Sequence, residues 1–343
     1  MDQLGARGSL LETLRLSRSL TQVELARLSG IPQATLSKAE SGGIELERER
    51  WQAIASALNV PTSAFEDAQS PIAPARVFHR KQRSTPIGAV KKIGADAALA
   101  QQRISDLFGP WATSLVRHDL EDGFVTPQEV ARVIRSQLGV HDEPIRDLIG
   151  LIEDAGVIVL LTTLDSVQVD AIATWPDDAV PVILIADHVS TERMRFTLAH
   201  ELGHAVMHDA EAMELQERQA DEFAAEFLLP AKRLLQEWPS DPTLDSLVTL
   251  KRRWGVSLAA LMRRAADVGA IGEPEYRGWS INLATSGMHR REPSPMPREH
   301  PRRLAAAVEL EKSRGETLET LAARAHMDPR EFTTSFLETE HTA

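Results

Sequence analysis

The chain has 343 residues, of which 43% are hydrophobic, and its 50 Asp and Glu against 38 Lys and Arg give a formal net charge of −12. This length predicts two or three domains, and the negative charge argues against a protein that coats nucleic acid over its whole surface. The absence of cysteine excludes disulfides, thiolate zinc sites and cysteine nucleophiles, so a metal ion would need His, Asp or Glu ligands. No apolar run approaches the length of a membrane span, so we expect a cytoplasmic protein without a membrane partner.

Residues 9–66 carry apolar side chains at helical spacing, which predicts a bundle of short helices. Thr21 and Glu24 form a capping box that begins one helix, and Gly30 ends it. A second helix from about Pro32 to Glu40 would complete a helix-turn-helix pattern. Because the second helix of this motif enters the major groove, the pattern predicts binding to double-stranded operator DNA, with a palindromic operator for a homodimer.

Five polar or small side chains of this pattern are predicted to contact DNA. Gln can pair with adenine, Lys with guanine, and Ala can touch a thymine methyl group. The predicted base contacts are Gln33, Ala34, Ser37 and Lys38, and the predicted phosphate contact is Gln22. Residues 1–66 hold seven Lys or Arg and eight Asp or Glu, so a helical scaffold without DNA binding is the alternative.

Residues 69–125 are predicted to form a basic linker and then a helix from about 96 to 118. The basic residues are Arg76, Arg80, Lys81, Arg83, Lys91 and Lys92, and no Asp or Glu lies among them. Their charge could supply the phosphate contacts that the helix-turn-helix lacks. A solvated linker is the alternative.

The central part of the chain predicts a mixture of helices and strands. Apolar, β-branched runs at 157–161, 169–174 and 180–186 are expected to be strands. Helices are expected from the capping box at Thr126 to about Leu138, over 145–154, from Thr191, and over about 211–229. The later residues read as helical, with a proline-rich break at 293–301 and no evident internal repeat.

His200, Glu201 and His204 form the pattern HELGH in the helix that begins at Thr191. Residues four apart lie on one face of a helix, so the two imidazoles can share one zinc ion. Glu201 can take a proton from the water that such an ion activates. The motif therefore predicts a zinc site with Glu201 as the general base.

A catalytic zinc site of this kind needs a third protein ligand and an open position. The helix predicted at 211–229 carries six carboxylates. Because an α-helix turns by about 100° per residue, their spacing predicts which of them lie near its apolar face. Glu217 borders the apolar face, with Asp221 one turn later, whereas Glu222 and Glu226 point away. We predict Glu217 as the third ligand, with Asp221 or Glu222 as rivals. Asp221 is also suited to hold the second nitrogen of a ligand histidine.

Three further residues are candidates for contact with a substrate. His208, one turn after His204, could stabilise an oxyanion, although a histidine favoured by the helix end is the alternative. Arg195 lies just upstream of the motif and is either structural or substrate-facing. Tyr276 is the single tyrosine, so it is the one candidate for a phenolic donor.

Two parts of the sequence resemble known families. TQVELARLSGIPQATLSKAESG resembles the Cro/repressor-type helix-turn-helix of the XRE family. RMRFTLAHELGHAVMH, followed by ERQADEFAAEFLLP and LKRRWGVSLAALMRRAADVGAI, resembles the ImmA/IrrE family of zinc metallopeptidases. The resemblances cover about residues 9–66 and 126–271, and the motifs after about residue 280 are less specific.

The second resemblance implies a gluzincin-like site in which His200, His204 and Glu217 hold Zn²⁺, with Mn²⁺ as a further ion for activity, and Glu201 is catalytic. Known members cleave a repressor protein and thereby derepress mobile-element or stress-response genes. Members fused to a helix-turn-helix also resemble regulators or antitoxin-like proteins in two-gene operons. The resemblance thus implies a DNA-binding regulator with a zinc endopeptidase domain that acts on a repressor or a toxin. The alternative is a non-proteolytic repressor or antitoxin whose zinc fold binds a partner protein or a small ligand.

The expected fold class is a multidomain, mainly α protein with a small β-sheet. It combines an all-α helix-turn-helix domain, an α+β zincin-like domain and a helical C-terminal region. The expected boundaries are 1–68 for the DNA-binding domain, 69–125 for the linker and helix, 126–271 for the metallopeptidase domain and 272–343 for the C-terminal domain.

Overall fold

The computed structural model describes residues 3–66, 68, 72, 87–109, 113–118, 120, 125–162, 170–175, 180–208, 214–288 and 291–337. These residues form a mainly helical protein with one small β-sheet, which confirms the expected fold class. None of the helices in these ranges is long and apolar enough to cross a membrane.

The chain divides into two compact units. One comprises Met1–Thr113, Gly156–Leu184 and Pro301–Ala343, and the other comprises Ser114–Ala155 and Ile185–His300. Each unit is built from segments that alternate along the sequence, whereas the expected domains are continuous and follow one another. The expected boundaries stay a prediction.

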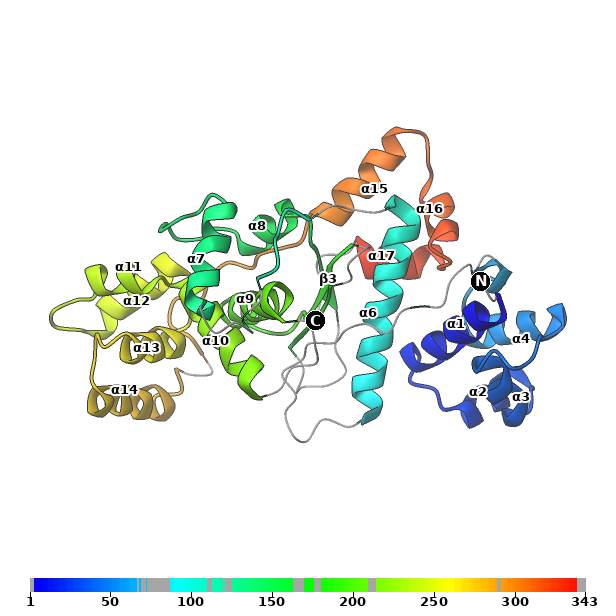
Figure 1. Ribbon diagram of the computed structural model, residues 1–343, viewed down its shortest axis with the longest axis horizontal. Coiled ribbons are helices and arrows are strands. Elements are labelled where there is room, and N and C mark those ends of the chain that lie inside the picture. Colours follow the sequence, from blue (N-terminus) through cyan, green and yellow to red (C-terminus); the bar gives the residue numbers. More distant parts are fainter. Residues whose placement is uncertain are drawn as a thin grey trace. The chain divides into compact units, whose positions relative to one another are not determined.

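The N-terminal helices of the first unit form a bundle, drawn in blue in Figure 1. Its elements are α1 Gln3–Ser17, α2 Gln22–Ser29, α3 Gln33–Glu40, α4 Arg48–Leu58 and α5 Ser63–Glu66. The predicted capping box of Thr21 and Glu24 begins α2, and Gly30 ends it in the left-handed conformation with a φ of 71°. Leu25 and Leu36 are fully buried between the helices, so α2 and α3 form the predicted helix-turn-helix.

Helix α6, Ile87–Phe108, begins and ends earlier than the helix predicted over 96–118. The alanine-rich sequence after residue 87 favours a helix, and Gly109, with a φ of 72°, ends it. Lys91 and Lys92 therefore belong to α6 and not to a linker, and Lys92 pairs with Asp96 at 2.8 Å. The other predicted linker cations, Arg76, Arg80, Lys81 and Arg83, lie outside the described residues.

Three strands form the sheet, in the order β1-β3-β2. They are β1 Ile158–Thr162, β2 Ala171–Thr174 and β3 Val182–Ala186, and each overlaps a predicted strand. Every residue of the central strand β3 is buried. In the first unit α6 contacts β2, and two helices of the C-terminal region, α15 Arg303–Ser313 and α17 Pro329–Phe336, contact β1.

The C-terminal helices α16 Leu318–Arg324 and α17 repeat the helix-turn-helix pattern of α2 and α3. The paired positions are Thr21 and Thr317 at the first cap, Leu25 and Leu321, Gly30 and His326 at the left-handed turn, Ile31 and Met327, and Leu36 and Phe332. Both caps accept a hydrogen bond from the backbone three residues on, and the Leu, Ile, Met and Phe positions are buried in both copies. The two pairs thus share the spacing of their buried positions, although few residue types recur between them.

This second copy keeps only some of the polar positions expected to read DNA, because Arg330, Thr333 and Thr334 stand where the first copy has Ala34, Ser37 and Lys38. Leu318 stands where the first copy has Gln22, and Pro329 stands where it has Gln33. An aliphatic side chain and a proline ring offer no hydrogen bond to a phosphate or a base edge. Because α16 contacts α6 and α17 contacts β1, we interpret the two helices as a helix-turn-helix pair that packs within the protein.

The second unit surrounds α9, Thr191–Met207, which is buried along nearly its whole length. Its other elements are α7 Pro127–Gln137, α8 Leu148–Asp154, α10 Glu214–Leu228, α11 Ala231–Glu237, α12 Leu244–Trp254, α13 Leu258–Asp267 and α14 Glu273–Thr285. Figure 1 shows α7 and α10 beside α9, and both helices contact it. Ser190 caps α9 by accepting a hydrogen bond from the backbone of Arg193.

Candidate metal centre and nucleic-acid interface

Helices α9 and α10 bring the predicted metal ligands together. Gly203 faces Phe223 of α10, and a Cβ at residue 203 would stand 2.9 Å from the Phe223 ring. The absence of a side chain at Gly203 therefore lets the two helices approach closely, one turn away from His200 and beside His204. Glu217, in the first turn of α10, is carried to the same place.

The Nε2 atoms of His200 and His204 and the carboxylate of Glu217 form a ligand triangle, in which each imidazole lies closest to a different carboxylate oxygen. The two Nε2 atoms are 3.1 Å apart. The Glu217 carboxylate oxygens lie 3.5 Å from His200 Nε2 and 3.4 Å from His204 Nε2. Ligands about 2.0–2.2 Å from a tetrahedral zinc ion stand about 3.3–3.6 Å from one another, so these residues fit the ion.

Each histidine is held from behind by a second polar residue. His200 Nδ1 lies 2.9 Å from Asp221 Oδ1, and His204 Nδ1 lies 2.9 Å from His208 Nδ1. An imidazole that offers Nε2 to a metal carries its proton on Nδ1, so both contacts have the geometry of a donated hydrogen bond. His208 thus lies on the far side of His204 from the ligand triangle, and the structure does not bring it to the position expected of an oxyanion donor.

The contacts of His208 continue through the protein to α10. Its Nε2 lies 3.1 Å from Gln219 Oε1, and its carbonyl oxygen accepts a hydrogen bond from Arg117 at 2.5 Å. If His204 donates to His208 Nδ1, the His208 proton sits on Nε2 and is donated to Gln219. The HELGH motif gave no signal for Gln219. This residue lies on α10, and its position next to His208 depends on how α10 packs against α9.

The site concentrates negative charge around a buried pair of histidines. Burial lowers the pKa of His200, but the Asp221 and Glu217 carboxylates outweigh that effect and raise this pKa to about 9. Burial of Glu217 raises its pKa, and hydrogen bonds with both histidines reverse this and hold the pKa well below its usual range. Burial lowers the pKa of His208 to about 4, which keeps it neutral. Such surroundings favour a bound cation.

Glu201 is buried with 1% exposure on α9, directly after His200. Its charge contributes to the raised pKa of His200, so the carboxylate lies within electrostatic range of the ligand triangle. The position of Glu201 is compatible with proton transfer at an ion held by that triangle.

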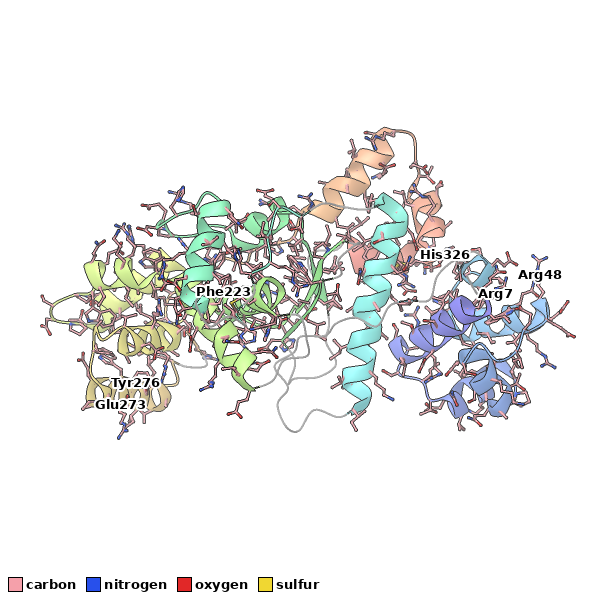
Figure 2. All side chains as sticks on the ribbon, viewed as in Figure 1. Arg7, Arg48, Phe223, Glu273, Tyr276 and His326 are labelled. Atoms are coloured by element: carbon pink, nitrogen blue, oxygen red, sulfur yellow. The ribbon has the colours of Figure 1, made fainter. Side chains whose placement is uncertain are left out.

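Two other predicted substrate residues do not reach the ligand triangle. Arg195 is fully buried and pairs with Glu299, and its guanidinium also donates to the carbonyl oxygens of Gly255 and Ile145 at 2.8 Å. It therefore ties α9 to neighbouring segments and does not face a substrate. Tyr276 lies on α14 beside Arg263, and Figure 2 shows it well apart from Phe223.

The remaining carboxylates of α10 point away from the triangle, in line with the predicted periodicity. Glu222 is exposed and accepts a hydrogen bond from Gln128 at 3.0 Å. Glu226 is buried on a second face, where it pairs with Arg264 and with Arg132. The sequence did not indicate that this second face of α10 is buried, because ion pairs and not apolar side chains cover it.

Replacing Glu217 by glutamine is expected to weaken zinc binding by two orders of magnitude or more, because an amide oxygen cannot supply the charge that the site needs. Glu222→Gln is the matched control on the same helix, and its zinc content should equal that of the parent chain. Titration with a competing chelator measures both affinities. Equal affinity of the two variants would remove Glu217 from the ligand set.

The predicted DNA-reading side chains lie on α2 and α3 of the N-terminal bundle, where Gln22 and Ser37 are half-buried. Gln33, Ala34 and Lys38 are exposed on α3. Gln22 Nε2 donates to Glu40 at 2.7 Å, and Gln33 Nε2 donates to Gln22 Oε1 at 2.7 Å. Glu40 is in turn held by a two-bond pair with Arg15. The two glutamines are therefore oriented before any DNA is bound.

Lys38→Ala is expected to cost roughly 1–3 kcal/mol of operator binding and to relax base preference at one position, because an exposed lysine at this helix position can read guanine. Arg48→Ala, which removes an exposed cation from α4, is the control and should leave base preference unchanged. Binding to operator duplexes selected from random sequence measures both. A sequence preference unchanged by Lys38→Ala would exclude Lys38 from base reading.

Two family models match the chain and confirm both resemblances. One, described as a helix-turn-helix, matches residues 11–65, and the other, described as an IrrE N-terminal-like domain of a peptidase family, matches residues 152–266. None of the curated proteins compared with the chain matches it. The chain therefore contains an XRE-type helix-turn-helix domain at residues 11–65 and an IrrE-like, metallopeptidase-like domain at residues 152–266.

Proposed function

We propose that this protein is a transcriptional regulator that binds operator DNA and hydrolyses a peptide bond in a partner protein. The partner is a repressor or a toxin of the same regulatory circuit. The observation that carries the proposal is the ligand triangle of His200, His204 and Glu217, with Glu201 buried next to it. Three donors with an edge length suited to zinc leave a fourth position open for a substrate or water.

His200, His204 and Glu217 would hold the ion, and Asp221 and His208 would fix the two imidazole rings. When bound, zinc supplies Lewis acidity, which polarises a carbonyl and acidifies water. The Glu201 carboxylate would take the proton of the attacking water and pass it to the leaving amine. Burial of Glu201 keeps that carboxylate close to the reacting atoms and away from competing solvent.

A second function has one specific observation in its favour. In the part of the chain that the structure describes, none of the expected oxyanion donors, His208, Arg195 and Tyr276, faces the ligand triangle. A protein that grips a partner or a small ligand through the metal, without cleaving anything, needs no such donor. This alternative is a non-proteolytic repressor or antitoxin.

Metal removal is expected to separate the fold from the activity. Treatment with a chelator should lower the melting temperature of the full chain, because an ion present at about a thousand times its Kd stabilises the fold by about 4 kcal/mol. The metal-free chain should also fail to cleave the protein encoded by the neighbouring gene, as read by mass spectrometry, and added zinc or manganese should restore cleavage. Cleavage that survives complete metal removal would contradict the proposal.

A further inference from the structure

A cavity of about 300 Å³ lies in the first unit, against the N-terminal bundle and remote in sequence from the metal ligands. Helix α1 contributes Leu10 and Leu14 to its wall, and α6 contributes Leu99. The second helix-turn-helix pair closes it with its turn, through Ala325 and His326. The cavity therefore touches the DNA-binding domain directly and has the size of small-molecule sites.

One buried cation of the cavity is incompletely paired. Arg103 of α6 lines the cavity with 12% of its side chain exposed, and its nearest carboxylate oxygen, on Glu331, is 3.8 Å away. Glu331 is engaged more closely by Arg18, at 2.8 and 2.9 Å. Two guanidinium groups thus share one carboxylate, and burial lowers the pKa of Arg103 to about 10. A second anion would be favourable here.

One acidic group of the cavity, Asp106, is only partly compensated, because the charge of His326 on the same wall lowers its pKa but does not offset the effect of burial. Asp106 lies three residues after Arg103 on α6 and lines the same cavity, where it accepts a hydrogen bond from Gln102 at 2.8 Å. Burial raises the pKa of Asp106. Within the described residues no ion pair joins Asp106 to Arg103, although both lie on the cavity wall. The cavity thus presents a separated positive and negative charge beside an apolar surface.

The turn that closes the cavity has a conformation that favours glycine. His326 has a φ of 53°, at the position where the first helix-turn-helix has Gly30. A non-glycine residue in this region is uncommon and costs free energy. Because the second pair has His326 and not glycine at this position, an imidazole forms part of the cavity wall. Figure 2 labels His326 at this turn.

We propose that this cavity binds a zwitterionic amino acid with an apolar side chain. Its carboxylate would pair with Arg103, its ammonium group with Asp106, and its side chain would pack against Leu10, Leu14 and Leu99. A ligand with both charges offsets the desolvation of both protein groups, whereas a ligand with one charge leaves the other uncompensated. Since α1 forms part of the wall, the bound ligand would contact the DNA-binding domain.

Calorimetric titration of the full chain with L-phenylalanine and L-leucine tests the proposal. Saturable binding with a Kd below about 1 mM is expected for at least one of them. Phenethylamine, which lacks the carboxylate, and N-acetyl-L-phenylalanine, which lacks the ammonium group, should each bind at least about tenfold more weakly, a loss of about 1.4 kcal/mol. No saturable binding up to about 10 mM of either amino acid, or equal binding of all three phenyl compounds, would overturn the proposal.

Variants test whether the ligand binds in this cavity, and their melting temperatures show whether each variant is folded. Arg103→Gln and Asp106→Asn should each weaken binding at least about tenfold. Ala64→Leu, which fills the cavity from α5 without changing its charge, should also abolish binding. Arg48→Gln removes an exposed arginine outside the cavity and should bind like the parent chain. Melting temperatures identify any variant that unfolds, and full binding by folded Arg103→Gln together with folded Ala64→Leu would place the ligand elsewhere.

Discussion

Replacing His204 by alanine is expected to abolish zinc binding and to leave the helical fold in place. His204 is fully buried, and its Nε2 forms two edges of the ligand triangle, at 3.1 Å to His200 and 3.4 Å to Glu217. Two ligands on separate helices hold zinc far more weakly than three. Elemental analysis of the purified variant should find no bound zinc, and circular dichroism should show unchanged helical content.

Two further histidine variants show whether the loss of zinc is specific to a ligand. His208→Ala removes the residue that contacts His204 Nδ1 but no ligand, so zinc affinity should fall by about 10–100-fold and not vanish. His188→Ala removes an exposed histidine of the same unit and should retain full affinity. If His204→Ala kept a full equivalent of zinc while His188→Ala lost it, the ligand triangle would be the wrong site.

The sequence was sufficient to predict the ligands because each lies in a helix whose period could be read directly. The four-residue spacing of His200 and His204 and the wheel of α10 both depend only on helix geometry. The structure brings His200, His204 and Glu217 together at that predicted arrangement. The roles of these residues in metal binding stay a prediction that the variants above test.

What the sequence did not reveal depends on packing between segments that are distant in the chain. His208 looked like an oxyanion donor because the four-residue spacing continues from His204, yet α9 ends at Met207 and His208 turns extended, with a φ of −125°. Its ring therefore meets Gln219 and not the open side of the site. Arg195 lies next to the motif in sequence, but its partner Glu299 is supplied by a segment about one hundred residues later.

The second helix-turn-helix pair was missed for a different reason. Its buried positions repeat those of the first pair, but Met327 replaces Ile31, Phe332 replaces Leu36 and His326 replaces Gly30. Apolar residues of different shape can fill equivalent positions, so the packing pattern persists while residue identity disappears. The left-handed turn was hidden because histidine is less typical of that conformation than glycine.

The variant Glu201→Gln is expected to separate the two functions that the site allows. The amide is nearly isosteric with the carboxylate and cannot accept the water proton, so zinc content, stability and operator binding should match those of the parent chain. As a general base Glu201 contributes about 10²–10⁴-fold in rate, so cleavage of the partner protein should fall by that factor. The variant Glu222→Gln, on the exposed side of α10, controls for loss of a carboxylate and should cleave normally.

The cellular response to Glu201→Gln then distinguishes an enzyme from a binding protein. A regulator that acts by proteolysis loses its response when the general base is removed, because binding of the partner continues but the peptide bond stays intact. A repressor or antitoxin that only grips its partner keeps its response, since neither the metal nor the surface has changed. We expect the response to be lost in a strain that carries Glu201→Gln, measured as transcription from the operator after the inducing signal. A full response, with zinc content confirmed in the purified variant, would rule out peptidase activity as the regulatory step and favour the binding protein.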